Sequence, residues 1–536
     1  MKKLKLVCVA IAMASAAPTF AGGLLTNTNQ HVAFNRMMSR EASIGIDGVY
    51  YNPAGVVFMG DGKHLAINWQ LAYQTRTINN DYSLFTNNVN NPITPRDFKG
   101  KAFAPVIPSF QYAYNKGKWS FQANFALTGG GGKCTFDDGL GSFEKIVSET
   151  AIAACGLAGV VDQTLGNALG QPGMEMFTSD QAFGKTGKYS FNSYMHGRQY
   201  YYGLSVGAAY KFCDNFSAFL GVRGVYALTN YYGYVENINV GNMPLYKVLD
   251  PTKENAANIE LSCDQTGVGF TPIIGVDYKT GRWNFSAKYE FKTRIRLKNK
   301  SVNQTPSIGN LPANLANQMT GILTAKYQQA GLPLEQAKQQ AENTTNAVLN
   351  DPTVGATMMG LKTQFDQKLN KAIGEYEDGK KIAGDIPGYL ALGIGYSPVD
   401  AVRVNVGFHW FDDKNATSYN NRNKELKRGT LEYNAGVEVD VNKKITLSTG
   451  WQNTNYGLSD EYMDDKSFVV GSNSAAIGGV YHINKKMDLN VAYFHTFYQH
   501  KKTSETVQLA ADKSIVYNSD YTRNNNVFAV GLDINF

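Results

Sequence analysis

The last nine residues of the chain alternate between two kinds of side chain. One set is apolar and comprises Phe528, Val530, Leu532, Ile534 and Phe536. The residues between them are small or polar, namely Ala529, Gly531, Asp533 and Asn535. Successive side chains of a β-strand point to opposite faces, so one face of this segment suits lipid and the other suits a polar lumen. The pattern predicts the final strand of a transmembrane β-barrel.

The same period of two recurs along the chain. Apolar and polar side chains fall on opposite faces in residues 283–292, 402–410, 431–440 and 488–493. Short polar turns with charges and glycines lie at residues 115–118, 213–215, 279–281, 397–400, 442–444 and 484–486. The connections between them are long. Short turns at one end and long loops at the other are typical of outer-membrane barrels.

The turns also give a strand count. Six short turns join twelve strands, and a first strand near residues 63–77 and a last strand near residues 523–536 bring the total to about fourteen. An even number is what such barrels require. A soluble β-sandwich or propeller would share the alternation, but the contrast between turns and loops favours the barrel. We therefore predict an all-β fold, a closed antiparallel barrel over residues 63–536.

Residues 1–21 have the organisation of an export signal. Lys2, Lys3 and Lys5 precede an apolar stretch too short to span a bilayer, and small residues lead to a predicted cleavage after Ala21. Losing three lysines and no acidic residue lowers the formal net charge from +7 to +4. So small a charge gives no reason to expect nucleic acid as a partner. We expect a Gram-negative outer-membrane protein that crosses the membrane many times.

Residues 22–62 precede the first predicted strand and show little period-two pattern. A barrel of about fourteen strands has room inside for more than side chains, so this stretch could fill the lumen as a plug. Its most structured part is predicted around Pro53, which fixes its own φ and restricts Asn52. An ordinary surface turn would account for the same pair of residues.

Two stretches break the β pattern and predict helical insertions at about residues 137–190 and 303–384. Apolar residues recur at helical spacing in Ser142–Gly170, and two apolar stripes follow in the longer insertion. The stripes are Leu315, Met319, Ile322 and Leu323, then Met358, Leu361, Phe365, Leu369 and Ile373. Pro333 is expected to begin a middle helix with Ala337 and Ala341 facing inward. Both insertions should lie outside the cell, where their apolar faces pack together or also offer surface to a ligand.

The stretch Ser43–Gly55 resembles the N-terminal hatch of the FadL/TodX family, outer-membrane transporters of long-chain fatty acids and other hydrocarbons. Asn52, Pro53 and Ala54 match the short Asn-Pro-Ala motif of that family. Two further similar stretches are Ala104–Phe110 and Gly221–Ala227. The resemblance covers most of the chain beyond the export signal, but the longer helical insertion has no residue-level match.

The resemblance implies a monomeric, fourteen-stranded barrel plugged by a hatch, with no cofactor. In such a transporter, ligand is captured on apolar surface of the outer loops and passes to a lumenal pocket. Hatch movement then lets it leave sideways at an inward kink in the third strand. Here Gly129 and Gly130 are candidates for that kink, although they could instead begin the following loop. Outer-membrane lipid and the barrel assembly machinery, which would engage the C-terminal strand, are the other expected partners.

The ligand expected first is a long-chain fatty acid, whose anionic head group would need a cation. Inward-facing Arg223, Lys288, Lys292 and Arg403 are the candidates, and the alternative is that each pairs with an acidic neighbour such as Glu290, Glu432 or Glu438. A water-filled porin or a structural barrel is the other function that this sequence allows. No catalytic residues or metal site can be named, since the histidines are scattered and no GxSxG element occurs, so an enzyme is not expected.

Four cysteines remain after export, and they allow three pairings. Cys134 and Cys155 fall within one predicted loop, so their disulfide would close the shortest ring. No pair has the CxxC spacing of a zinc site.

Overall fold

The computed structural model describes residues 24–306, 308–510 and 513–536. The predicted export signal, residues 1–21, therefore lies outside the described part of the chain. Fourteen long strands form a closed antiparallel barrel, and β1 hydrogen-bonds to both β2 and β18. Closure pairs the first strand of the barrel with the last, so neither is left as a free sheet edge in the bilayer. The predicted fold class is confirmed.

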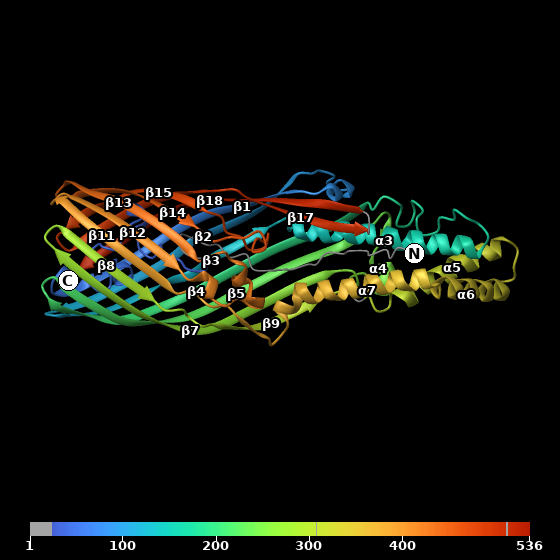
Figure 1. Ribbon diagram of the computed structural model, residues 1–536, viewed down its shortest axis with the longest axis horizontal. Helices are drawn as coiled ribbons and strands as arrows, with labels where there is room; N and C mark the ends of the chain where they lie inside the picture. The colour runs from blue at the N-terminus through green and yellow to red at the C-terminus, as the bar shows by residue number, and fades with distance from the viewer. Residues whose placement is uncertain (1–23, 307, 511–512) are drawn as a thin grey trace.

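The barrel strands follow one another around the wall in chain order (Figure 1). They are β1 Gly62–Asp81, β2 Arg96–Lys116, β3 Trp119–Phe136, β4 Tyr189–Cys213, β5 Phe216–Val240, β7 Ile259–Thr280, β8 Trp283–Glu290, β11 Tyr389–Val399, β12 Val402–Phe411, β13 Thr430–Asn442, β14 Ile445–Asn455, β15 Ser472–Asn484, β16 Met487–Tyr498 and β18 Lys513–Asn535. Shorter strands extend the wall at the long-loop end: β6 Met243–Pro244, β9 Arg296–Gln304, β10 Lys381–Ala383 and β17 Lys501–Ala510.

The predicted alternation separates an apolar outer face from a polar inner face. On β1, Ile67 and Trp69 are each 42% exposed, whereas Asn68 between them is 2% exposed. The same division holds along β13, where Tyr433 lies outside and Glu432 lies inside. An outer face of this kind suits lipid, and the inner face supplies polar groups to the lumen.

Five helices form a cap at the long-loop end, on the right in Figure 1. They are α3 Gly141–Ala168, α4 Tyr246–Leu249, α5 Leu311–Gln329, α6 Leu334–Leu349 and α7 Pro352–Ile373. The helix α3 begins one residue before the predicted stretch, and α6 begins at Leu334, directly after Pro333. By length and composition α3 could cross a membrane, but its apolar residues belong to one core shared with α5, α6 and strands of the barrel.

The predicted helix stripes differ from the structure at one described position. Leu315, Met319 and Leu323 are buried, as are Ala337 and Ala341 on α6, whereas Ile322 is 40% exposed. In the second stripe Met358 is buried and Leu361 packs against the same core. The side chains of Phe365, Leu369 and Ile373 lie outside the described residues.

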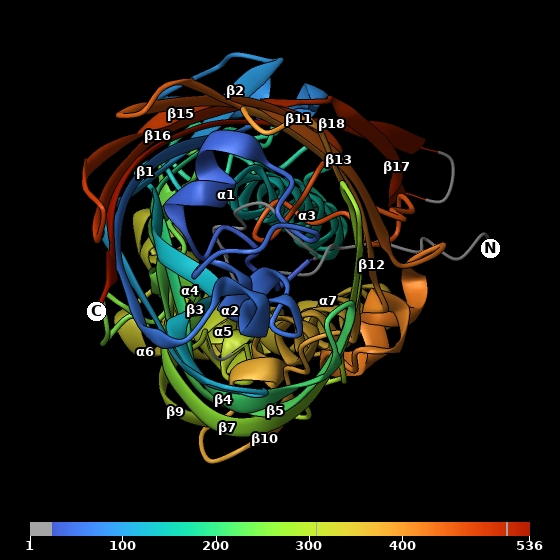
Figure 2. The ribbon, with the colours of Figure 1, turned by 90° about the vertical axis from the view of Figure 1, so that its left-hand side faces the viewer.

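Residues 24–61, which we call the lumenal segment, lie inside the barrel. Figure 2 looks along the barrel and shows α1 (Val32–Met37) and α2 (Gly48–Tyr51) within the ring of strands. The short helix η1 (Gly55–Met59) leads from them to β1. Almost every residue from 25 to 57 is buried, although much of the segment is polar. Four more short helices, η2 Ser83–Asn87, η3 Gly374–Tyr376, η4 Asp413–Asn415 and η5 Tyr419–Glu425, belong to the loops.

Candidate functional site: a filled lumen beneath an apolar cap

The lumenal segment is hydrogen-bonded to inward-facing polar residues of the wall. Gln70 on β1 accepts from Asn29 at 3.1 Å and from Asn35 at 2.8 Å. Ser109 on β2 donates to the carbonyl oxygen of Gln30 at 2.6 Å. A polar lumen would otherwise have to be solvated by water, so the inner faces of these strands are matched to the polar chain that fills them.

Glycines on the inner face bring the backbone of the segment against the wall. A side chain at Gly436 on β13 or Gly450 on β14 would overlap the carbonyl oxygen of Met37. One at Gly393 on β11 would collide with the backbone of Glu41 and Ala42. Glycine in a strand usually weakens it, and here each marks a close approach of another backbone.

Buried ion pairs connect the segment to one side of the wall. Glu438 on β13 binds Arg36, lies 3.5 Å from Arg40 of the segment, and pairs with Arg403 on β12 at 2.7 Å. Arg40 also binds Asp47 at 2.6 Å.

A histidine forms a second polar connection between segment and wall. His409 on β12 lies between two carboxylates, 2.7 Å from Glu41 of the segment and 2.8 Å from Glu432 of β13. Buried charged groups are tolerated only when paired, and these groups are paired across the boundary between segment and wall.

The Asn-Pro-Ala motif lies against the wall near the short-turn end. Asn52 donates to Asp277 of β7 at 2.6 Å and accepts from the backbone of Gly55 at 3.1 Å. The carbonyl oxygen of Pro53 accepts from Gln122 on β3 at 2.7 Å, and that of Ala54 accepts from Ser217 on β5 at 2.7 Å. The motif thus joins the segment to three strands.

The four cations predicted to bind a head group are already engaged. Arg223 and Lys288 share Glu290, with Lys288 at 2.9 Å. Lys288 also donates to the carbonyl oxygen of Tyr50 at 2.6 Å. Lys292 is half-buried and donates to a loop carbonyl at 3.0 Å, and Arg403 holds Glu438 as well as Asp440. The sequence left open that each cation pairs with an acidic neighbour. At least three of the four cations are paired in this way.

Arg76, another inward-facing cation, differs from these four in its hydrogen bonding. Arg76 on β1 is 1% exposed, and its Nη1 and Nη2 atoms have no hydrogen-bond partner among the described residues. Its neighbour across the strand pair is Arg523 of β18, so two like charges lie side by side. Sequence reasoning missed this residue. The alternation of β1 predicts its inward direction, but its partner depends on a register between strands at opposite ends of the chain.

The wall is interrupted between β2 and β3. Their pairing runs to Phe110↔Phe125 and resumes only at Phe103↔Lys133. Within the gap, β3 has bulges around Gly129 and Gly130, and Gly130 has a φ of 67°. The lumenal segment reaches this part of β3, because Asn27 donates through its backbone to Thr128 at 2.9 Å and through its side chain to Gly130 at 2.7 Å.

These glycines are part of a strand rather than the start of a loop, so the loop alternative is wrong. A side chain at Gly129 would overlap the carbonyl oxygen of Leu25 in the segment. The glycines therefore accompany both the bulges and the close approach of another backbone.

The predicted Cys134–Cys155 disulfide is absent from the structure, where both residues are free thiols. Cys134 lies on β3 rather than in a loop, and Cys155 lies in the middle of α3. The Cys155 thiol points to the carbonyl oxygen of Phe183 at 3.4 Å. The prediction assumed one flexible loop, but β3 continues past Cys134 to Phe136.

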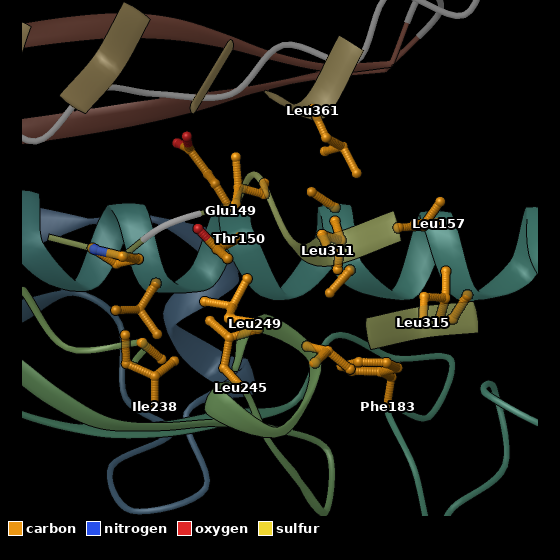
Figure 3. A pocket seen from close by; sticks show the side chains of 18 of the residues that line it. Glu149, Thr150, Leu157, Phe183, Ile238, Leu245, Leu249, Leu311, Leu315 and Leu361 are labelled. Atoms are coloured by element: carbon orange, nitrogen blue, oxygen red, sulfur yellow. The ribbon is translucent and has the colours of Figure 1, made fainter. Parts of the chain in front are cut away.

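The helical cap contains a partly open apolar cavity of about 150 Å³. The cavity lies between α3 and α5 and between these helices and the loop that carries α4 (Figure 3). Its wall includes Leu157, Phe183, Leu249, Leu311 and Leu315. An apolar cavity of this size can hold a molecule about as large as benzene.

Below the cap lies a polar vestibule of about 1110 Å³. Leu24 and Leu25 of the lumenal segment line it, and so does Lys145 of α3. Residues of α3 therefore border both cavities, since Ile146 lines the apolar one. From the long-loop end inward, the order is apolar cavity, polar vestibule and filled lumen.

A closed wall, an apolar outer face and a filled lumen define a transmembrane β-barrel of the outer-membrane type. No family model and no curated protein sequence matches the chain. The crystal structure of a Pseudomonas aeruginosa FadL homologue is similar, with a TM-score of 0.58 and 14% identity over 96% of this chain and 100% of that chain. The chain therefore has the FadL-type fold that its hatch-like stretch predicted.

Two toluene transporters are also among the similar structures. TodX of P. putida has a TM-score of 0.48 and 11% identity, and TbuX of Ralstonia pickettii has 0.45 and 13%. Each comparison covers 92% of this chain and 94% of the other.

Proposed function

We propose that this protein is a passive outer-membrane transporter that takes up hydrophobic small molecules, with long-chain fatty acids as the leading ligand class. The observation that carries the proposal is the sequence of compartments: an apolar cavity outside, a polar vestibule, and a lumen filled by the chain itself. A greasy molecule cannot cross a polar saccharide layer unaided, because each exposed CH₂ group costs about 0.8 kcal/mol. Capture in the cap cavity would offset that cost.

The interruption between β2 and β3 supports a sideways exit. The stretch of β2 between Phe103 and Phe110 has no ladder partner on β3, and the lumenal segment hydrogen-bonds β3 there instead. If residues 24–61 act as a hatch, withdrawing Asn27 would uncover a gap that faces lipid. Gly129 and Gly130 would then line the exit.

Arg76 supports a carboxylate head group within the lumen. A buried guanidinium with two nitrogen atoms unpaired is costly, and an anion would satisfy both in the bidentate geometry that arginine favours. The four cations first considered are less suited, because each would have to leave a partner. In this proposal the vestibule leads from the cap cavity toward Arg76.

Uptake of labelled fatty acid into cells that lack their own transporter tests the proposal. Filling the cap cavity with Ala153→Leu should lower uptake several-fold, whereas the same change at exposed Ala330 should not. Arg76→Met should weaken retention of the carboxylate by at least about tenfold, since it removes both charge-assisted hydrogen bonds of the bidentate pair. Barrel integrity is checked by the compact migration of the unheated protein in a detergent gel.

A water-filled porin is the competing function. Conductance of the purified protein in a planar bilayer separates the two, because a filled lumen should pass little current. A steady conductance like that of a general porin, together with unchanged fatty-acid uptake in Ala153→Leu, would defeat the proposed function.

A further inference from the structure

The wall of the cap cavity is apolar except at two positions. Among the described residues that line it, only Glu149 and Thr150 have polar side chains, and both come from α3. Figure 3 shows both side chains extending from α3 among the apolar side chains of the cavity wall, with the Glu149 carboxyl group directed away from Leu245 and Leu249. A carboxyl group in such surroundings is expensive to bury unless its oxygens are hydrogen-bonded.

Only one of the two carboxyl oxygens of Glu149 has such a partner. The side chain is 2% exposed, and its Oε1 accepts from the hydroxyl of Tyr82 at 2.8 Å. Its Oε2 is buried and has no hydrogen-bond partner among the described residues. A buried polar atom left without a partner in a cavity wall is what a ligand group would satisfy.

The charged groups around Glu149 do not compensate it. Lys145, one turn earlier on α3, lies 4.0 Å from Oε1 but is paired with Glu505 of β17 at 2.8 Å. The Lys145 ammonium also contacts the ring of Tyr517. Burial raises the pKa of the Glu149 carboxyl to about 8, with the carboxylate of Glu505 adding to the effect and Lys145 and Tyr82 opposing it. At neutral pH the group therefore retains its proton.

We propose that Glu149 Oε2 hydrogen-bonds the head group of a neutral amphiphile whose apolar part fills the cap cavity. Suitable head groups are an alcohol, a phenol or a carboxylic acid in its protonated form, each of which can pair with a neutral carboxyl group. The assignment rests on the proposed function, because it names the form in which that ligand is captured. A deprotonated carboxylate is disfavoured, since Lys145 is engaged and Glu505 is close.

The cavity volume limits the apolar part. About 150 Å³ accommodates roughly one benzene ring, so a longer chain has to extend beyond the cavity. The head group is held on the side of the vestibule, because Lys145, which borders Glu149, also lines the vestibule. Release from Glu149 would therefore pass the ligand toward the lumen.

Three probes of similar size test the assignment on the full chain in detergent at pH 7: 4-methylphenol, toluene and 4-methylbenzoate. Calorimetric titration of the wild-type protein should show 4-methylphenol binding about tenfold more tightly than toluene, the effect of one hydrogen bond. The anion 4-methylbenzoate should bind more weakly than 4-methylphenol. Glu149→Met should bring 4-methylphenol down to the affinity of toluene, whereas Glu149→Gln and the control Thr150→Val should retain the preference.

The infrared carbonyl band of the protonated carboxyl group can be followed in the wild-type protein, so a shift caused by ligand is measured without a variant. In the folded wild-type protein the band should shift when 4-methylphenol is added and stay unchanged with toluene. Its disappearance in Glu149→Gln assigns it. An identical band with both probes would overturn the assignment, even if Glu149→Met failed to fold.

Ala153→Leu separates the two proposals. If it weakens toluene and 4-methylphenol alike while Glu149→Met leaves their ratio unchanged, the cavity is the capture site and the role of Glu149 is wrong. If it changes the affinity of neither probe, the cavity does not capture ligand and both proposals fail. Both proposals are supported if Ala153→Leu loses binding of both probes and Glu149→Met loses only the preference for 4-methylphenol over toluene.

Discussion

The lumenal segment and the helical cap fill the two ends of the same passage by opposite means. The segment is attached to the wall by hydrogen bonds, shared carboxylates and glycine-lined contacts, as at Gln70, Glu438 and Gly450. The cap is assembled from apolar side chains and retains a cavity with one unpaired carboxyl oxygen, on Glu149. The position of the lumenal segment is therefore fixed by many polar contacts, whereas the arrangement of the cap is fixed by the packing of apolar side chains.

That difference has a physical consequence for how each region can respond to a ligand. Apolar packing is non-directional, so helices of the cap can adjust to ligands of different shape at modest cost. A polar boundary loses several pairings at once when it opens, and each unpaired buried group costs free energy. We therefore expect the cap to accept a range of ligands and the segment to remain closed until many contacts are replaced together.

Gly450→Val should produce the largest effect, because it removes the space that the segment occupies. Its side chain would overlap the carbonyl oxygen of Met37, and the segment cannot retreat without losing the contacts of Arg36. We expect the lumenal segment to leave its position and the barrel to conduct ions in a planar bilayer. Gly224→Val is the matched control, since a side chain there meets only ordinary contact with Phe270.

A conductance of Gly450→Val equal to that of the wild type would show that the glycine is not needed for the fit. The lumenal segment would then not be held by close backbone contacts with the wall. A second glycine, Gly436, approaches the same carbonyl oxygen and should behave in the same way.

Glu438→Ala should have a smaller effect on the lumenal segment. It leaves Arg36, Arg40 and Arg403 without the carboxylate they share, and removing one partner of a buried ion pair costs roughly 3–5 kcal/mol. Amide hydrogen exchange should rise in residues 32–37 while the barrel strands remain protected. Asp440→Ala removes a carboxylate that binds one arginine, Arg403, and the Thr446 hydroxyl at a half-exposed site, and it should cost about 0–1 kcal/mol.

Equal exchange in Glu438→Ala and Asp440→Ala would mean that the shared carboxylate contributes no more than a surface pair. The segment would then depend on its hydrogen bonds and on the glycine contacts instead.

The barrel could be predicted because the sequence of each strand shows which of its side chains face lipid and which face the lumen. The alternation in residues 431–440 separates lipid from lumen without reference to any other strand, and the prediction is confirmed. The helices of the cap could be predicted for the same reason, since an apolar stripe such as Leu315, Met319 and Leu323 is a local feature of the sequence.

The partners of lumenal charges could not be predicted, because they depend on contacts between distant parts of the chain. Arg223 on β5 pairs with Glu290 on β8 across the intervening strand β7, and Arg76 faces Arg523. Gly129 and Gly130 were equally ambiguous, because their place in β3 rather than in a loop is set by pairing with β4 and by contacts with distant residues such as Asn27. A local pattern reveals that a residue faces the lumen, but not what it meets there.

The stability of the cap should depend on pH through the carboxyl group of Glu149, whose Oε2 has no hydrogen-bond partner among the described residues. The pKa of Glu149 rises from 4.5 to about 8 on folding, so between these values the folded cap holds a proton that the unfolded chain has lost. The contribution of this group is therefore fully present below pH 4.5 and is lost as the pH rises toward 8. Hydrogen exchange in α3, corrected for its intrinsic pH dependence, should increase across that window in the wild type.

Glu149→Gln cannot titrate, so the difference between it and the wild type isolates this residue. Subtraction is needed because burial also raises the pKa of Glu375 to about 7 and that of Asp465, which binds the backbone of Ser142, to about 6. Parallel profiles in the two proteins would show that the Glu149 carboxyl is already satisfied. In that case the cap would be specified by polar pairing as fully as the lumenal segment, and the contrast between the two regions would disappear.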